Sequence, residues 1–100
     1  MTNSRLYTVV LDYRGGTYIG QASGDSVNAA LSQWVSKLKH EELTEWGITR
    51  DELADIAGSD EPVLLKGCIN VWCLSGSTNS GLALLNVIAT DQSSEQISSN

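Results

Sequence analysis

The chain has 100 residues, a length that suits a single domain with a small core. Apolar residues make up 41% of it and charged residues 18%, proportions typical of a globular protein and not of a disordered one. The formal net charge of −6 and the pI near 4.4 disfavour a nucleic-acid or anionic-membrane surface, and they favour a neutral or basic partner.

The ends and the cysteines indicate the compartment. The N-terminus lacks a charged segment followed by an apolar run, so we expect no signal peptide. No apolar run approaches the roughly 20 residues of a membrane helix. Cys68 and Cys73 fall in one predicted strand, where their Cα atoms would be roughly 16 Å apart, too far for a disulfide. We therefore expect reduced, buried thiols and a cytoplasmic protein.

A β-hairpin followed by a helix is predicted first. Strand-forming residues run from Leu6 to Asp12 and from Thr17 to Ala22, and Gly15-Gly16 between them suits a tight turn. Asp25 or Ser26 then caps the helix. Its apolar stripe follows three- and four-residue spacing and comprises Val27, Ala30, Leu31, Trp34, Val35 and Leu38. We expect this helix to lie across one face of the sheet.

The middle of the chain is predicted to be helical. Residues His40 to Trp46 are polar and acidic and predict a helical turn. A better-marked helix runs from about Arg50 to Ala57, because Thr49 and Glu52 have the spacing of a capping box. We expect Gly58 to end this helix in the left-handed conformation.

The last third predicts strands. Val63 to Leu65 suits a short edge strand, and Cys68 to Ser75 alternates as a longer strand. Gly76 to Gly81 is rich in Gly and Ser, so we expect a flexible loop. Leu82 to Thr90 is nearly all apolar, which favours a central strand. Residues 92–100 are rich in Ser and Gln and predict a disordered tail.

The order of elements defines the fold class. Two hairpins around a helical middle give β-β-α-α-(β)-β-β. We therefore predict an α+β fold in which one antiparallel sheet of two β-hairpins carries helices packed on one face, within a single domain of residues 1–91.

No catalytic, metal or cofactor motif stands out. His40 is the only histidine and has no nucleophile motif beside it, so we expect an exposed residue at a helix C-terminus. The Gly/Ser loops lack the spacing of a phosphate-binding or dinucleotide-binding loop. The acidic residues lack the spacing of a calcium-binding loop. We expect a chain without catalytic activity, metal or cofactor.

One segment concentrates the negative charge. Between Glu41 and Glu61 only Arg50 opposes eight acidic residues, which leaves a net charge of −7. The eight are Glu41, Glu42, Glu45, Asp51, Glu52, Asp55, Asp60 and Glu61. Such a surface would attract a basic protein partner, and a solvated helix face is the alternative interpretation.

Residues 6–38 also carry a family resemblance. The motifs that carry it are, in chain order, Tyr7-Thr8-Val9-Val10, Gly15-Gly16-Thr17-Tyr18 with Gln21, and Gly24-Asp25-Ser26-Val27 with Ala29-Ala30-Leu31. This order resembles the HicB-like antitoxin fold, whose members run a strand, a Gly-Gly-x-Tyr turn and strand, and a helix begun by Gly-Asp-Ser/Thr. The resemblance implies an antitoxin that neutralises a small basic ribonuclease.

These observations predict a small, acidic, non-catalytic protein-binding module. An antitoxin, an immunity protein and an inhibitor protein fit this prediction equally well. A small ligand-binding domain or enzyme with a sheet-face pocket near Trp72 and Cys73 is an alternative. An oligomerising structural protein, such as a homodimer joined through an edge strand at Leu6–Asp12, is another.

Overall fold

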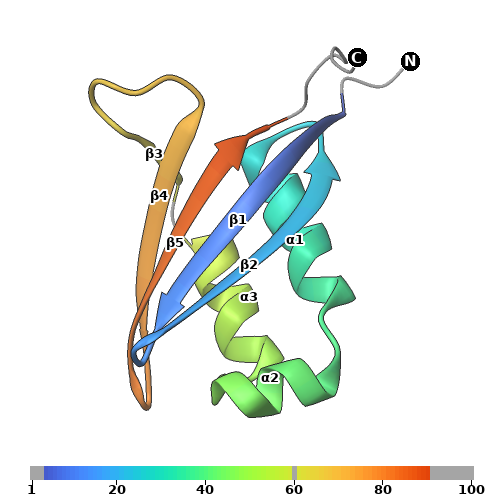
Figure 1. The fold of residues 1–100 in the computed structure, drawn as a ribbon, viewed down its shortest axis with the longest axis vertical. Helices are drawn as coiled ribbons and strands as arrows, with labels where there is room; N and C mark the ends of the chain where they lie inside the picture. Colours follow the sequence, from blue (N-terminus) through green and yellow to red (C-terminus); the bar gives the residue numbers. More distant parts are fainter. Residues whose placement is uncertain (1–3, 60, 91–100) are drawn as a thin grey trace.

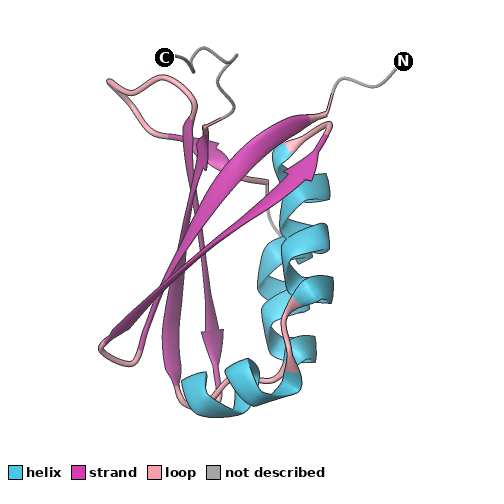
Figure 2. Cartoon of the chain, turned by 45° about the vertical axis from the view of Figure 1, so that its right-hand side comes forward, coloured by secondary structure: helices cyan, strands magenta, loops and turns pink. Residues whose placement is uncertain are grey.

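The computed structural model of the chain describes residues 4–59 and 61–90 (Figure 1). Its elements are β1 (Arg5–Tyr13), β2 (Gly16–Gly24), α1 (Val27–Lys37), α2 (His40–Trp46), α3 (Arg50–Ser59), β3 (Val63–Leu64), β4 (Val71–Thr78) and β5 (Gly81–Ala89). The predicted α+β class is confirmed, with the helices gathered on one side of an antiparallel sheet (Figure 2). The predicted tail, residues 92–100, lies outside the described residues.

The strand order of the sheet is β2-β1-β5-β4-β3, and every neighbouring pair is antiparallel. The central place of β5 and the edge place of the short β3 are confirmed. The prediction that Leu6–Asp12 forms an edge is wrong. β1 pairs with β2 on one side and with β5 on the other, from Tyr7↔Ala89 to Tyr13↔Ala83, so β2 is the edge strand.

The first hairpin closes through two residues, Arg14 and Gly15. Their φ values are +52° and +82°, which are the positive values that a tight hairpin turn of this twist requires. Tyr13 pairs with Gly16, so Gly16 begins β2 instead of lying in the turn as expected. The tight turn therefore uses one glycine and one arginine.

The first helix begins at its predicted cap. The Ala29 N–H donates to Ser26 Oγ at 3.1 Å, which satisfies one of the free amides of the first turn. The predicted apolar stripe is buried against the sheet. No helix in the described part of the chain is long and apolar enough to cross a membrane.

The capping box of α3 is also confirmed. The Glu52 N–H donates to Thr49 Oγ1, the Thr49 N–H donates to Glu52 Oε1, and both bonds measure 3.0 Å. The end of the helix differs from the prediction, because α3 continues through Gly58 to Ser59. Gly58 is not among the positive-φ glycines, and a helix interior tolerates glycine at a cost of about 1 kcal/mol.

The second long hairpin starts later than predicted. β4 begins at Val71, and Cys68 precedes it in a turn where its N–H donates to the Leu65 carbonyl at 3.1 Å. The two cysteines therefore do not share a strand. Asn70, with φ of +64°, is the left-handed residue that redirects the chain into β4.

The flexible loop expected over Gly76–Gly81 is wrong. Gly76 to Thr78 belong to β4, and Thr78 pairs with Gly81 across a turn of only two residues. Thr78 Oγ1 accepts the Ser80 N–H at 3.1 Å and donates to the Gly81 carbonyl at 3.2 Å, so its side chain bonds to the backbone of the turn. A Gly/Ser-rich composition here marks a hairpin end instead of a loop.

The core lies between the sheet and the helices. Alternate residues of β1 and β5 point into it and are fully or almost fully buried: Tyr7, Val9, Leu11, Tyr13, Ala83, Leu85 and Val87. Trp34 of α1 packs onto Gly20 of β2, where a Cβ would come within 2.7 Å of the indole Nε1. Trp46 of α2 stacks on Trp34 with ring centroids 6.3 Å apart, so α2 is anchored to α1 through aromatic rings.

Candidate interaction surface

The acidic residues do not form one cluster. Three lie on α2, three lie on α3, and one precedes β3; in chain order these are Glu41, Glu42, Glu45, Asp51, Glu52, Asp55 and Glu61. Asp60, the eighth predicted residue, lies outside the described residues. Glu61 lines a hollow at the β3–β4 edge together with Val63 and Cys73, so it belongs to a different part of the surface from α2.

Two of the carboxylates serve helix caps. Glu42 Oε1 accepts the Lys39 N–H at 2.8 Å at the start of α2. Glu52 closes the capping box of α3, and its Oε2 also accepts the Asn79 N–H at 3.4 Å. These backbone bonds, first from Thr49 and then from Asn79, hold the pKa of Glu52 below its ordinary value of 4.5. Both residues therefore have structural roles that are independent of any partner.

Four other carboxylates are exposed and take part in no cap: Glu41 and Glu45 on α2, and Asp51 and Asp55 on α3. Each pair has i, i+4 spacing, which places its two like charges on one helix face. Like charges at this spacing destabilise an isolated helix by a few tenths of a kcal/mol, about the size of the gain from an opposite pair. Glu41 and Asp51 lie in the first turns of their helices, where negative charge is favourable, whereas Glu45 and Asp55 lie beyond them.

Arg50, the single cation between Glu41 and Glu61, does not neutralise these four carboxylates. Arg50 points inward, and its guanidinium donates to the carbonyls of Val35 at 2.5 Å and Leu38 at 2.6 Å. These carbonyls end α1, where positive charge is favourable and free acceptors need partners. Within residues 4–59 and 61–90, none of the segment's carboxylates forms an ion pair with a lysine or arginine.

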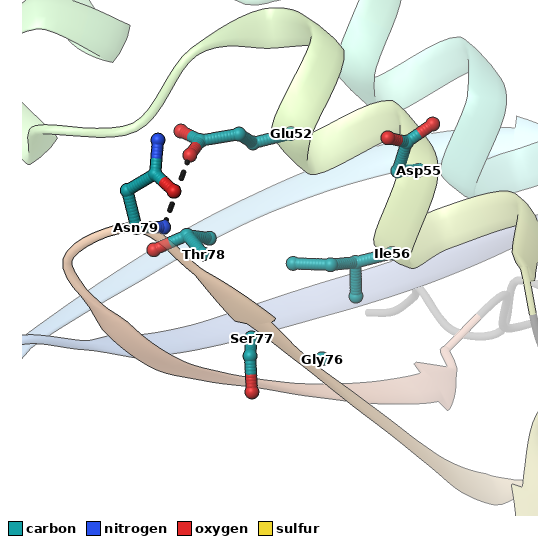
Figure 3. Close-up of a pocket in the computed structure, with 7 residues that line it drawn as sticks. All are labelled: Glu52, Asp55, Ile56, Gly76, Ser77, Thr78 and Asn79. Carbon is teal, nitrogen blue, oxygen red and sulfur yellow. Dashed lines mark hydrogen bonds between the residues drawn. The ribbon is translucent and has the colours of Figure 1, made fainter.

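A cleft of about 460 Å³ lies beside the acidic residues of α3, between that helix and the β4–β5 hairpin (Figure 3). Its lining comprises Glu52, Asp55, Ile56, Gly76, Ser77, Thr78 and Asn79. Ile56 lies over Gly76, where a Cβ would come within 2.6 Å of Ile56 Cγ1, so glycine permits the close approach of α3 to β4.

The cleft's hydroxyls are not arranged as an activated nucleophile. Thr78 Oγ1 bonds to the Tyr13 hydroxyl at 2.5 Å and accepts the Ser80 N–H. Neither a histidine nor a lysine lies among the residues that line the cleft. A nucleophile needs an adjacent base or another means of activation.

The two residues of the alternative site, Trp72 and Cys73, lie in different environments. Cys73 lines a hollow of about 480 Å³ at the β3–β4 edge, together with apolar side chains. Trp72 packs against the core and meets Tyr7 edge to face with ring centroids 6.0 Å apart. Both cysteines are free, but the expectation of burial is wrong, because Cys68 is exposed and Cys73 is half-buried.

His40 also differs from its expected place. It is exposed, as predicted, but it is the first residue of α2 and does not lie at the C-terminus of a helix. Its Nε2 lies 3.4 Å from Thr44 Oγ1, one turn along the same helix. In the described part of the chain, no group of three or more His, Cys, Asp or Glu side chains could hold a metal ion.

The geometry thus defines an α+β domain with an acidic helical layer and a bare opposite sheet face. Comparison with known proteins adds no relative, since no family model, curated protein or solved structure matches the chain. The predicted binding surfaces did not include the sheet face that lies opposite the helices. The signal was present in Leu82 to Thr90, where a strand that is apolar at successive positions has two apolar faces.

Proposed function

We propose that the chain is a non-catalytic protein-binding module that binds a basic protein through its helical layer. The binding residues are Glu41, Glu45, Asp51 and Asp55, which we call the acidic surface. The observation that carries the proposal is that these exposed carboxylates take part in no cap, while Arg50, the one cation between Glu41 and Glu61, is bonded to carbonyls at the end of α1. An excess of like charge without internal compensation favours an oppositely charged partner.

The family resemblance supports the same kind of partner. Residues 6–38 resemble HicB-like antitoxins, which bind small basic ribonucleases, and their motifs fall on the strands and helix that pack together as β1, β2 and α1. An immunity or inhibitor protein directed against a basic enzyme would use the acidic surface in the same way. All three would act by covering the partner and not by chemistry of their own.

A capture experiment tests the proposal. The wild-type chain serves as bait in lysate of its native host at low and at moderate salt. As the Debye length falls from about 30 Å at 0.01 M to about 10 Å at 0.1 M, capture of a basic protein should decrease. Stopped-flow association with the captured protein should slow over the same range, because steering by charge acts mainly on the association rate.

Charge reversal separates the acidic surface from net charge. Changing Glu41, Glu45, Asp51 and Asp55 to Lys should slow association strongly and leave folding nearly intact, because exposed charges contribute little to stability. The matched pair is Asp55→Lys and Asp25→Lys, which change an exposed residue by the same charge at different places. Association that is independent of salt, or slowed equally by the two single changes, would contradict the proposal.

A further inference from the structure

The sheet has one covered face and one bare face. The helices lie on one side only, and the face opposite them, which we call the open face, has no element of the described chain over it (Figure 2). Large apolar side chains project from it: Ile19 is 70% exposed, Leu82 is 56% exposed and Leu84 is 37% exposed. Val10 and Ile88 lie on the same face and are half-buried.

Several of the polar side chains on the open face are hydrogen-bonded to one another. Gln21 Nε2 donates to Thr8 Oγ1 at 3.0 Å, and that hydroxyl lies 2.9 Å from Thr90 Oγ1. Thr17 Oγ1 donates to Asp12 Oδ1 at 2.7 Å. These hydrogen bonds join β2 to β1 and β1 to the end of β5. The bonded side chains would therefore keep their partners if another surface covered them. Asp12 is the one charged residue among the open-face positions that the registers of β1, β2, β4 and β5 define.

The edges of the sheet are partly protected, in contrast to its open face. At the β2 edge, the Ser23 N–H donates to Gln33 Oε1 at 2.7 Å and Lys37 Nζ donates to the Gln21 carbonyl at 3.4 Å. Side chains of α1 thus occupy backbone groups that an added strand would need. At the other edge β3 has two residues and follows Pro62, both features that discourage strand pairing, but it pairs only with Trp72 and Cys73, so β4 has no strand beside it from Leu74 to Thr78. The open face has the larger set of exposed apolar side chains, which favours association through the face.

We propose that a second copy of this chain covers the open face, so that two sheets pack face to face in a homodimer. Four strands of eight or nine residues make a face about 19 Å wide and 30 Å long. Its projected area is on the order of 600 Å², and side-chain relief adds to the accessible area. A standard stable interface needs about 800 Å² from each partner, so this face alone has nearly the required size.

Other occupants fit less well. The residues outside the described ranges, 1–3, 60 and 91–100, include only Met1 and Ile97 as large apolar side chains, too few to cover the face. A basic partner would find one carboxylate there, that of Asp12, already bonded to Thr17. A second copy brings the same face, on which Asp12 is the one charged residue, and this suits a self-complementary two-fold interface.

The charge of the chain also favours this geometry. Two chains of formal charge −6 repel each other, so a dimer needs its acidic parts apart. With layers about 10 Å apart, face-to-face packing puts the two helical layers roughly 30 Å from each other. That separation exceeds the Debye length of about 8 Å at physiological salt, so the repulsion between the two copies of α3 is largely screened.

Light scattering during size exclusion, together with sedimentation equilibrium, tests the dimer. At micromolar concentration the wild-type chain should have twice the 10.7 kDa mass of one copy. Ile19→Glu and Leu84→Glu should each weaken the dimer roughly tenfold or more, because each would bury an unpaired charge. Ile69→Glu is the matched control, since Ile69 is 85% exposed in the turn before β4 and belongs to no strand of the sheet, and it should leave the mass unchanged.

Salt distinguishes this interface from the acidic surface. Dimerisation should strengthen as salt screens the repulsion, whereas binding of a basic protein should weaken. The four-lysine variant of the acidic surface should still dimerise, and Ile19→Glu should still bind the basic partner. A monomeric wild type up to the millimolar range would overturn the dimer and leave the proposed function standing. An equal effect of Ile19→Glu and Ile69→Glu on the mass would also overturn it.

Discussion

The covered face and the open face of the sheet differ in the number and the environment of their polar side chains. On the covered face, Leu85 is completely buried under the helices, and that face contributes no buried polar or charged residue in the described chain. On the open face, its neighbour Leu84 is 37% exposed and lies between Asp12 of β1 and Ser75 of β4. Adjacent residues of β5 therefore have opposite environments, as the two-residue period of a strand requires.

The difference teaches what each face is built to contact. The covered face is mostly apolar because the helices exclude water from it, and an unbonded polar group there would cost about 1–3 kcal/mol. The hydroxyl of Tyr13, which is buried on this face, is bonded to Thr78. The open face keeps apolar side chains but pairs its polar ones across strands, as in Gln21 with Thr8. A face that met only water would have no need of Ile19 or Leu82, which supports a contact that forms after folding.

The largest expected effect is on the covered face. Trp34→Ala should lower the free energy of unfolding by about 3–5 kcal/mol, because the indole is buried against Gly20 and stacked on Trp46. Ser32→Ala, an exposed change in the same helix, is the control and should stay within about 0.5 kcal/mol. Denaturant unfolding measures both. A loss below about 1 kcal/mol for Trp34→Ala would mean that α1 does not depend on this contact.

The sharpest comparison uses neighbouring leucines of β5. Leu85→Ala should cost about 2–5 kcal/mol through the cavity that it leaves, and Leu84→Ala should cost well under half as much in the isolated chain. Urea titrations at two protein concentrations separate folding from association. If the open face dimerises, the Leu84→Ala difference grows with concentration, while the Leu85→Ala difference stays constant. Equal losses for the two leucines would erase the distinction between the faces.

Local chemistry made much of this fold predictable. The caps at Ser26 and Thr49 and the apolar stripe of α1 depend on residues three or four apart, so the sequence shows them directly. The pairing of β1 with β5 joins residues about 80 positions apart, and no local pattern indicates it. The Leu6–Asp12 edge was therefore predicted wrongly, although the strand itself was predicted correctly.

The structure differs from two predictions that were based on glycine residues. Gly76 lies in β4 because Ile56 of α3 needs the space of a missing side chain, and this requirement is invisible in a Gly/Ser-rich run. Gly58 stays helical, although glycine after an apolar helix usually marks its end. For the candidate site, exposure of the acidic residues could be predicted, but the use of Glu42 as a cap could not, since Lys39 is not a usual capping residue.

A smaller effect concerns α3, one of the helices that cover the sheet. Thr49→Ala should cost about 1 kcal/mol, because its Oγ1 accepts the Glu52 N–H at 3.0 Å. Thr44→Ala, a change in exposed α2, removes a hydroxyl that caps no helix and should cost less. The shift of the urea midpoint measures both changes. Identical midpoints for the two variants would show that the capping bond does not stabilise α3.

The smallest expected effect depends on pH and concerns Glu52, which joins α3 to the β4–β5 turn. The N–H groups of Thr49 and Asn79 lower the pKa of this carboxyl in the folded chain, so folding favours its charged form. Its contribution to stability is therefore complete above the unfolded value of 4.5 and is lost as the pH falls through the lower folded value. The two bonds use different oxygens, Oε1 for Thr49 and Oε2 for Asn79, so Glu52→Gln removes the charge and leaves one acceptor oxygen in place of two. The difference in unfolding free energy between wild type and Glu52→Gln should be constant near pH 7 and should narrow below about pH 4.5, since a protonated glutamate resembles glutamine. Parallel stability curves from neutral to acid pH would show that the charge of Glu52 does not hold the turn against the helix.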